Sequence, residues 1–122
     1  MRRRNTVLAA FELFRKLTPD LWINNVLTFL YICENEGASV TEIAQISRLL
    51  EATASRCIRS FAAPGTPGAM KPALGLVELV EDPSDGRGRL VYLTAKGRIL
   101  ADQIDGLIRD GVTISGKSAD AA

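Results

Sequence analysis

The sequence predicts a mainly α-helical fold with one small β-hairpin, of the α+β class. Apolar residues recur at three- and four-residue intervals in several separate segments, which is the spacing of one helix face. Two β-rich runs, 76–81 and 89–93, flank a polar stretch that contains glycine, which predicts a hairpin. With 122 residues, 47% of them hydrophobic, the chain can bury one core but is too short for two domains.

The first expected helix spans about residues 5–16. A helix that is apolar on two sides needs two neighbours, and in a chain this small the second can belong to another subunit. Burial of both stripes within one chain is the alternative. Residues 2–4 are all arginine and form either a flexible basic arm or an ordinary charged terminus. The two apolar stripes are Val7, Phe11 and Phe14, and Ala10, Leu13 and Leu17.

Three residues predict the start of the second helix: Thr18 as N-cap, Pro19 at the first helical position and Asp20 as an acid in the first turn. It should run to about residue 33 or 34, with Gly37 suited to a left-handed C-cap. Apolar residues occur nearly all round it, which predicts the central core helix; they are Leu21, Trp22, Ile23, Val26, Leu27, Phe29, Leu30, Tyr31 and Ile32.

Two short helices joined by a tight turn are expected between residues 39 and 61. Ser39 and Glu42 have capping-box spacing, and the first helix has its apolar side at Ile43, Ala44 and Ile46. Residues 48–50 form the turn, and the second helix opens near Glu51, where an acid suits the helix dipole.

The second of these helices has two contrasting faces. Small residues, hydroxyls and guanidinium groups, with no carboxylate after Glu51, are typical of a helix that enters a DNA major groove. A solvated surface with ordinary arginines is the alternative. The expected core stripe is Ala54, Cys57, Ile58 and Phe61; the opposite face is Ala52, Arg56 and Arg59, flanked by Thr53, Ser55 and Ser60.

A loop of about a dozen residues follows, because residues 62–75 contain three prolines and clustered glycines. Within it Lys71 can lie against a phosphate, or the loop can be a tolerated surface insertion. The hairpin after it has its expected tip at 82–88. A hairpin in this position would be a wing whose Arg87, and also Arg89, reach an adjacent minor groove or its phosphates. Asp85 can pair with Arg87 or cap the turn; a tip that is polar only because it is exposed is the alternative.

Thr94 is the expected N-cap of a last helix over 95–109. The chain thus reads as one domain, 1–110, with an N-terminal arm and helix at 1–17, a core at 18–94 and a C-terminal helix at 95–110. Residues 111–122 are small and polar and are expected to be disordered. The apolar face of the last helix is Leu100, Ile104, Leu107 and Ile108.

Composition argues against several function classes. The net charge of +1 excludes a polybasic coat for nucleic acid, yet residues 48–98 hold eight basic against five acidic side chains. With no histidine, no P-loop and two cysteines, the sequence predicts no enzyme, cofactor or metal site. No apolar run is long enough for a membrane span, and charges at 12, 15 and 16 interrupt a signal-peptide pattern, so a cytoplasmic protein is expected.

Taken in order, these segments resemble the MarR (multiple antibiotic resistance regulator) family of winged helix-turn-helix transcription factors. The resemblance covers residues 17–104. It rests on Leu-Thr-Pro-Asp at 17–20, Thr-Glu-Ile-Ala at 41–44, Thr-Ala-Ser-Arg at 53–56, Leu-Gly-Leu-Val-Glu at 74–78 and, most specifically, the wing and following helix start at 82–98. It implies a homodimer with interlocked terminal helices, recognition helices in successive major grooves of double-stranded DNA, and wing arginines in the flanking minor grooves.

By position, the resemblance implies groove-facing roles for Ala52, Thr53, Ser55 and Arg56, a phosphate contact for Arg59, and a wing pair in Asp85 and Arg87. Three departures from the family pattern bear on the dimer and on any pocket for a small-molecule effector of unknown identity. Leu50 replaces the usual Ser or Thr cap, residues 62–73 are an insertion, and there is one modest C-terminal helix.

Some members of the family sense oxidants through a cysteine. Cys33 and Cys57 each lie in an apolar stripe with no adjacent base, which is typical of core residues rather than reactive thiolates.

Two functions are therefore compatible with the sequence. The first is a dimeric, sequence-specific DNA-binding regulator, most simply a repressor. The second is a winged-helix module for protein–protein assembly in a replication, phage or plasmid complex. The arginines favour the first, because assembly does not require Arg56, Arg59 and Arg87 to lie on one side.

Overall fold

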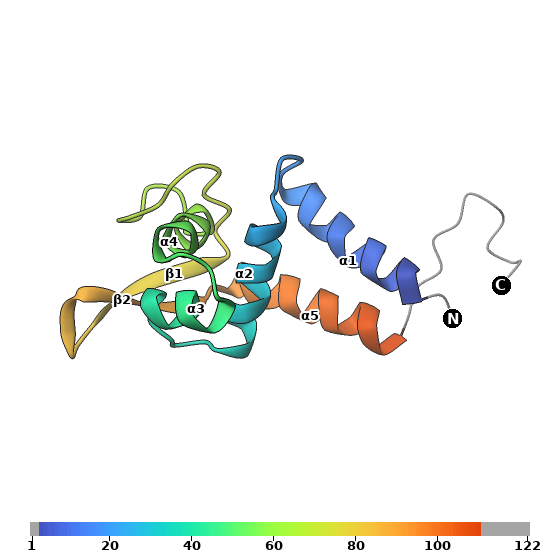
Figure 1. The fold of residues 1–122 in the computed structure, drawn as a ribbon. Helices are drawn as coiled ribbons and strands as arrows, with labels where there is room; N and C mark the ends of the chain where they lie inside the picture. The colour runs from blue at the N-terminus through green and yellow to red at the C-terminus, as the bar shows by residue number, and fades with distance from the viewer. Residues whose placement is uncertain (1–2, 111–122) are drawn as a thin grey trace, which may run out of the picture.

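The computed structural model describes residues 3–110 of the chain. In Figure 1, α3, α4 and the hairpin gather at one end, while α1 and α5 run alongside each other toward the other end. The expected α+β class is confirmed. The elements are α1 (Arg3–Leu17), α2 (Ile23–Glu34), α3 (Val40–Ser47), α4 (Glu51–Ser60), β1 (Val77–Asp82), β2 (Asp85–Leu93) and α5 (Ala95–Asp110).

The predictions for the two ends of the chain have different outcomes. Arg3 and Arg4 lie in the first turn of α1, so the expected flexible arm is wrong for these two residues. Arg2 and the expected disordered tail lie outside the described residues. None of the described helices is both long enough and apolar enough to cross a membrane.

The core is centred on α2 and is built on three aromatic rings. Phe29 of α2 makes edge-to-face contacts with Phe14 of α1 and with Phe61 at the end of α4, at centroid distances of 5.7 and 5.9 Å. Such pairs add to the hydrophobic stabilisation from burial. Helices from both ends of the molecule are therefore joined through one side chain of α2.

Helix α2 begins later than predicted. The amide of Thr18 donates to the carbonyl of Phe14 and so closes α1, and the side chain of Asn25 accepts from the amide of Trp22, which is the actual N-cap. The helix C-cap is Asn35, although Gly37 does have a positive φ of 93°.

Helix α2 is the central core helix that the sequence predicts, but its apolar residues are not all buried. Val26, Phe29 and Ile32 are buried, because these residues face α1, α3 and α4. On the side of α2 that residues 3–110 do not cover, Ile23, Leu27 and Leu30 are exposed, and so is Trp22 at the N-cap.

The predicted helix-turn-helix is present, and its capping box is confirmed. The Ser39 hydroxyl accepts from the Glu42 amide at 3.0 Å, and the Glu42 carboxylate accepts from the Ser39 amide at 2.9 Å. Ile43 is buried, but Ile46 is exposed, so the predicted apolar side of α3 is narrower than expected. Arg48 ends α3 in a left-handed conformation with φ of 60°.

The hairpin is longer than predicted. Strands β1 and β2 pair antiparallel, with Val77 opposite Leu93, and β2 already begins at Asp85. A shift in register between Glu81 and Asp82 lets the ladder continue to the tip. The Asp82 carboxylate accepts from the amide and hydroxyl of Ser84, so this residue caps the turn.

Helix α5 starts where Thr94 predicts, since its hydroxyl accepts from the Gly97 amide at 3.1 Å. Leu100 and Ile104 are buried as expected. Ile108 is exposed, because the last turn of α5 extends beyond the core, and the four-residue buried face predicted for this helix is wrong at that position.

Candidate nucleic-acid interface

The two faces of α4 separate as the sequence predicts, with one exception. Ala54, Cys57, Ile58 and Phe61 are buried, and Ala52, Arg56 and Arg59 are exposed. Thr53 and Ser55 are half-buried on the flanks, whereas Ser60 is buried. Because α4 packs through its apolar stripe, its small and basic face is turned outward.

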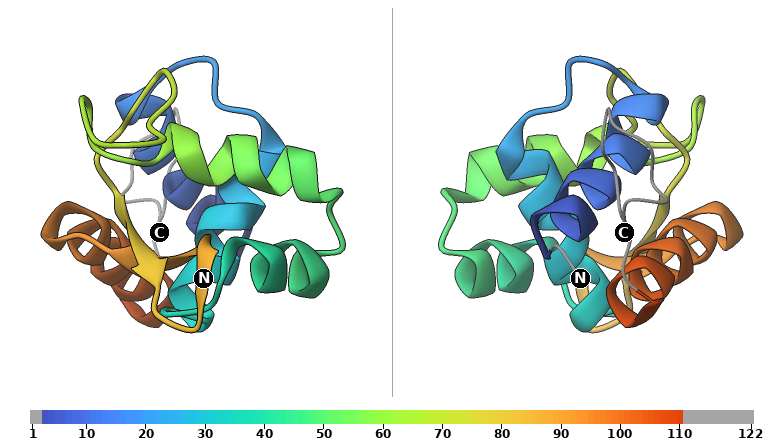
Figure 2. Two further views of the ribbon diagram at one scale, coloured as in Figure 1. Left: turned by 90° about the vertical axis from the view of Figure 1, so that its left-hand side faces the viewer. Right: turned by 90° about the vertical axis from the view of Figure 1, so that its right-hand side faces the viewer.

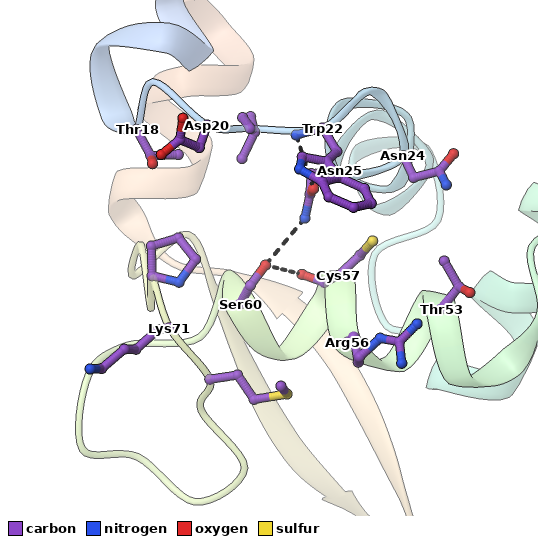
Figure 3. Close-up of a pocket in the computed structure, with 13 residues that line it drawn as sticks. Thr18, Asp20, Trp22, Asn24, Asn25, Thr53, Arg56, Cys57, Ser60 and Lys71 are labelled. Carbon is purple, nitrogen blue, oxygen red and sulfur yellow. Dashed lines mark hydrogen bonds between the residues drawn. The ribbon is translucent and has the colours of Figure 1, made fainter.

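Side-chain hydrogen bonds connect both ends of α4 to neighbouring segments. At its start the Thr41 hydroxyl donates to the Glu51 carboxylate at 2.6 Å, which ties α3 to α4 and engages the one acid of the helix. Near its end Asn25 donates to the Ser60 hydroxyl at 3.4 Å, and this hydroxyl donates to the Cys57 carbonyl at 2.6 Å (Figure 3). This network explains why Ser60 is buried.

Residues 62–75, which we call the 62–75 loop, fold back onto the C-terminal end of α4. The amides of Met70 and Leu74 donate to the carbonyls of Arg59 and Ser60, each at 3.0 Å. Carbonyls at a helix end have no partner within the helix, so the loop supplies donors that α4 lacks. The Arg59 side chain in turn donates from Nε to the Gly68 carbonyl at 2.7 Å, which holds this predicted phosphate contact against the loop.

The hairpin tip lies on the same face as α4. Figure 2 (left) shows α4 crossing this face, with the hairpin tip below it and the 62–75 loop beyond its C-terminal end. Asp85 and Arg89 are exposed, and Arg89 lies opposite Glu81 in the ladder. Arg87 lies in β2, but its side chain is outside the described part of the structure, so its pairing with Asp85 stays a prediction.

A groove of about 900 Å³ lies along α4 on the side away from the hairpin (Figure 3). The sequence placed Thr53 and Arg56 at the interface but did not connect them with the start of α2. The sequence gives no sign of Trp22 at this site, because its apolar character predicts a core position. Of the loop residues that line the groove, the sequence indicates only Lys71. The lining residues are Thr18, Asp20, Leu21, Trp22, Asn24 and Asn25 before and in α2, Thr53, Arg56, Cys57 and Ser60 of α4, and Met70, Lys71 and Pro72 of the loop.

The surroundings of both cysteines favour the neutral thiol over the thiolate. Burial, with the nearby carboxylates of Glu34 and Asp105, raises the pKa of Cys33 to about 11. Burial also raises the pKa of Cys57. Reactive cysteines have lowered pKa values, so the raised pKa values of both thiols agree with the expectation that they are unreactive. Cys57 is buried as expected, whereas Cys33 is half-buried. Among the described residues, no three His, Cys, Asp or Glu side chains are grouped so as to hold a metal ion.

Comparison with known proteins gives similarity in fold but not in sequence. No family model matches the chain, and no curated protein matches its sequence. Solved structures do match. A MarR transcriptional regulator from Methanosarcina mazei Go1 has a TM-score of 0.63 at 15% identity, with 93% of this chain and 78% of the other covered.

Two further structures are informative because of what they describe. BpsR of Bordetella bronchiseptica, whose DNA binding is regulated by 6-hydroxynicotinic acid, has a TM-score of 0.53 at 22% identity over 90% of this chain and 83% of its own. A mutant MarR from E. coli in complex with operator DNA has a TM-score of 0.59 at 20% identity over 86% and 69%. The chain thus has a MarR-like winged-helix fold, as the sequence predicts.

Proposed function

We propose that two copies of this chain form a sequence-specific, double-stranded DNA-binding transcriptional regulator, most simply a repressor that occludes a promoter. One observation carries the proposal: the outward face of α4 combines small and basic side chains and lies beside the hairpin tip on one face of the molecule. The only acid of α4 is already engaged by Thr41. Helix and hairpin together suit a major groove and its neighbouring minor groove.

The roles of the side chains follow from their positions on α4 and the hairpin. Near the start of α4, Ala52, Thr53 and Ser55 approach base edges, where small and hydroxyl side chains permit close contact. Arg56 and Arg59 lie further along and carry positive charge toward the flanking phosphates. In the hairpin, Arg87 enters the minor groove, supported by Asp85, and Arg89 lies behind it toward the backbone.

Dimer formation is part of the proposal and is supported by exposed apolar side chains on α1 and α5. Val7, Leu8 and Phe11 of α1 are 55%, 48% and 40% exposed, and Ile108 of α5 is 65% exposed. Both helices lie at the end of the molecule away from α4 (Figure 1). A second copy that covers this patch would place two α4 helices in successive major grooves of a palindromic site.

The proposal includes the setting in which such a regulator works. We place the protein in the cytoplasm, where it can reach DNA. We also propose that a small-molecule effector modulates its DNA binding, by analogy with the effect of 6-hydroxynicotinic acid on BpsR.

The test is selection from a random duplex library followed by fluorescence anisotropy across a salt series. We expect enriched duplexes with two related half-sites about one helical turn apart, and affinity that falls steeply with salt. Arg87→Ala should weaken binding and make the salt dependence shallower, whereas Arg109→Ala, at the far end of α5, should not. Absence of binding at low salt would refute the proposal and favour a protein partner.

A further inference from the structure

The groove beside α4 lies where a DNA strand would run that neither the recognition helix nor the hairpin contacts. An α-helix with its side chains is about 10–12 Å across, and the major groove is about 12 Å wide. A helix in that groove therefore has a sugar-phosphate backbone along each flank. On one flank of α4 lie α3 and the hairpin (Figure 2). On the other flank lies the groove (Figure 3).

We infer that this groove, between the start of α2, the outer face of α4 and the 62–75 loop, seats the sugar-phosphate backbone of one DNA strand, with Arg56 and Lys71 as its phosphate contacts. The inference rests on the proposed function and adds to it a second backbone contact, supplied by the loop. Lys71 then extends the interface beyond the helix and hairpin.

The charges of the groove fit a phosphate chain. Arg56 and Lys71 are both exposed and come from different elements, α4 and the loop, so that they lie at separate points along the groove. Among the described residues that line it, Asp20 is the single carboxylate, and it is exposed before the start of α2. Asn24 adds a side-chain amide that can donate a hydrogen bond to a phosphate oxygen.

The groove is held in shape before DNA arrives. Across its floor Asn25 of α2 donates to Ser60 of α4 (Figure 3). On the loop side, the backbone bond from Met70 to Arg59 and the side-chain bond from Arg59 to Gly68 fix the segment that carries Lys71. Preformed geometry reduces the entropy lost on binding, so exposed cations in such a frame can contribute to affinity.

Trp22 supplies an apolar surface in the same groove. Trp22 is 74% exposed and is the N-cap of α2. The first amides of a helix favour negative charge, so the start of α2 adds to the attraction of a phosphate, while the indole can lie against deoxyribose. It is the only tryptophan in the chain and is therefore a fluorescence probe placed in the groove.

The first experiment is fluorescence anisotropy of a labelled duplex across a salt series, with wild type, Lys71→Ala, Asp20→Asn and Arg109→Ala. Each lost phosphate contact lowers the log–log salt slope by about 0.9. We expect Lys71→Ala to bind several-fold more weakly on every duplex sequence, with a slope lower by about one. Asp20→Asn should bind more tightly at low salt, and Arg109→Ala should match wild type.

The second experiment measures quenching of Trp22 fluorescence by acrylamide, a neutral quencher. Saturating duplex should lower the quenching constant at least two-fold in wild type and in Arg109→Ala. Each variant is first compared with wild type by circular dichroism, so that a change in fold is not mistaken for a lost contact.

The outcomes separate this inference from the proposed function. If wild type binds and Arg87→Ala weakens binding, but Lys71→Ala keeps the wild-type slope and Trp22 remains equally accessible, the groove is overturned as a backbone seat and the proposed function stands. If Lys71→Ala alters the preference among sequences, Lys71 contacts bases and the inference is wrong. If wild type binds no duplex at low salt, both fail.

Discussion

Helices α1 and α4 are both amphipathic, but only α4 buries its apolar stripe within the chain. Cys57, Ile58 and Phe61 lie against the core, whereas Val7 and Phe11 of α1 are exposed and only Phe14 of that stripe is buried. The cause is position. Helix α4 lies across α2 and the start of β1, while α1 extends with α5 beyond the end of the core (Figure 1).

This difference shows that an apolar stripe predicts which face of a helix is buried, but not which part of the chain, or which other chain, covers that face. In α4 the neighbours belong to the same chain, so its polar face is fixed outward, where we propose that it contacts DNA. In α1 the N-terminal part of the stripe is only partly covered by the rest of residues 3–110, which is the basis for proposing a second copy. Four predictions test this contrast, beginning with the largest effect.

Matched truncations of two phenylalanines should differ most. Phe61→Ala removes a fully buried ring and should lower the free energy of unfolding by about 4 kcal/mol. Phe11→Ala removes a ring that is 40% exposed and should cost less than about 1 kcal/mol at protein concentrations where the chain is monomeric. Urea denaturation followed by circular dichroism measures both; equal losses would contradict the contrast.

A second pair uses two glycines of α5, the helix that reaches both regions. A Cβ added at Gly97 would lie 2.1 Å from the carbonyl oxygen of Leu76, so Gly97→Ala should destabilise the protein by about 3 kcal/mol. A Cβ at Gly106 meets nothing closer than Arg109 at 3.7 Å, so Gly106→Ala should stabilise by about 0.5 kcal/mol through helix propensity. Thermal denaturation compares them, and a stable Gly97→Ala protein would show that α5 can move away from Leu76.

The third prediction concerns the exposed part of α1. Phe11→Asp places a charge in the patch that we propose a second copy covers, and it should weaken the dimer by about 2 kcal/mol, roughly 30-fold in its dissociation constant. Sedimentation velocity over a concentration series measures this change. A variant with the same association as wild type would show that the patch is not the dimer interface.

The smallest effect is expected from the cap of α3. Ser39→Ala removes the acceptor for the Glu42 amide and should cost about 1 kcal/mol of stability. Because α3 supports the start of α4 through Thr41 and Glu51, DNA affinity should also fall modestly. Denaturation curves and anisotropy on the same samples check both, and an unchanged curve would mean that water replaces the hydroxyl.

The elements that sequence patterns located well are those with local causes. The capping box at Ser39 and Glu42, the stripe of α4 and the Thr94 cap all depend on residues three or four apart, and all are present. The start of α2 was misplaced because Thr18 completes α1, a contact that competes with its role as a cap. The hairpin tip was placed too broadly because a register shift inside the ladder leaves little trace in a sequence.

In the candidate site, too, local features were predictable from the sequence and contacts between distant segments were not. Sequence periodicity placed Ala52, Arg56 and Arg59 on the outward face of α4, and the structure agrees. It gave no hint that the Arg59 side chain bonds to the Gly68 carbonyl or that Trp22 and Arg56 line the same groove. These pairings join the start of α2, α4 and the 62–75 loop, which are separated by stretches of chain with their own structure.

The sequence by itself determined the kind and order of the elements, the caps that start α3 and α5, and the two-faced character of α4, because each arises from interactions within a few residues. Only the tertiary structure decided which apolar faces are covered, where the 62–75 loop turns, and that a groove runs beside the outer face of α4. Those features depend on contacts between distant segments, whose geometry is set by packing of the whole core around Phe29.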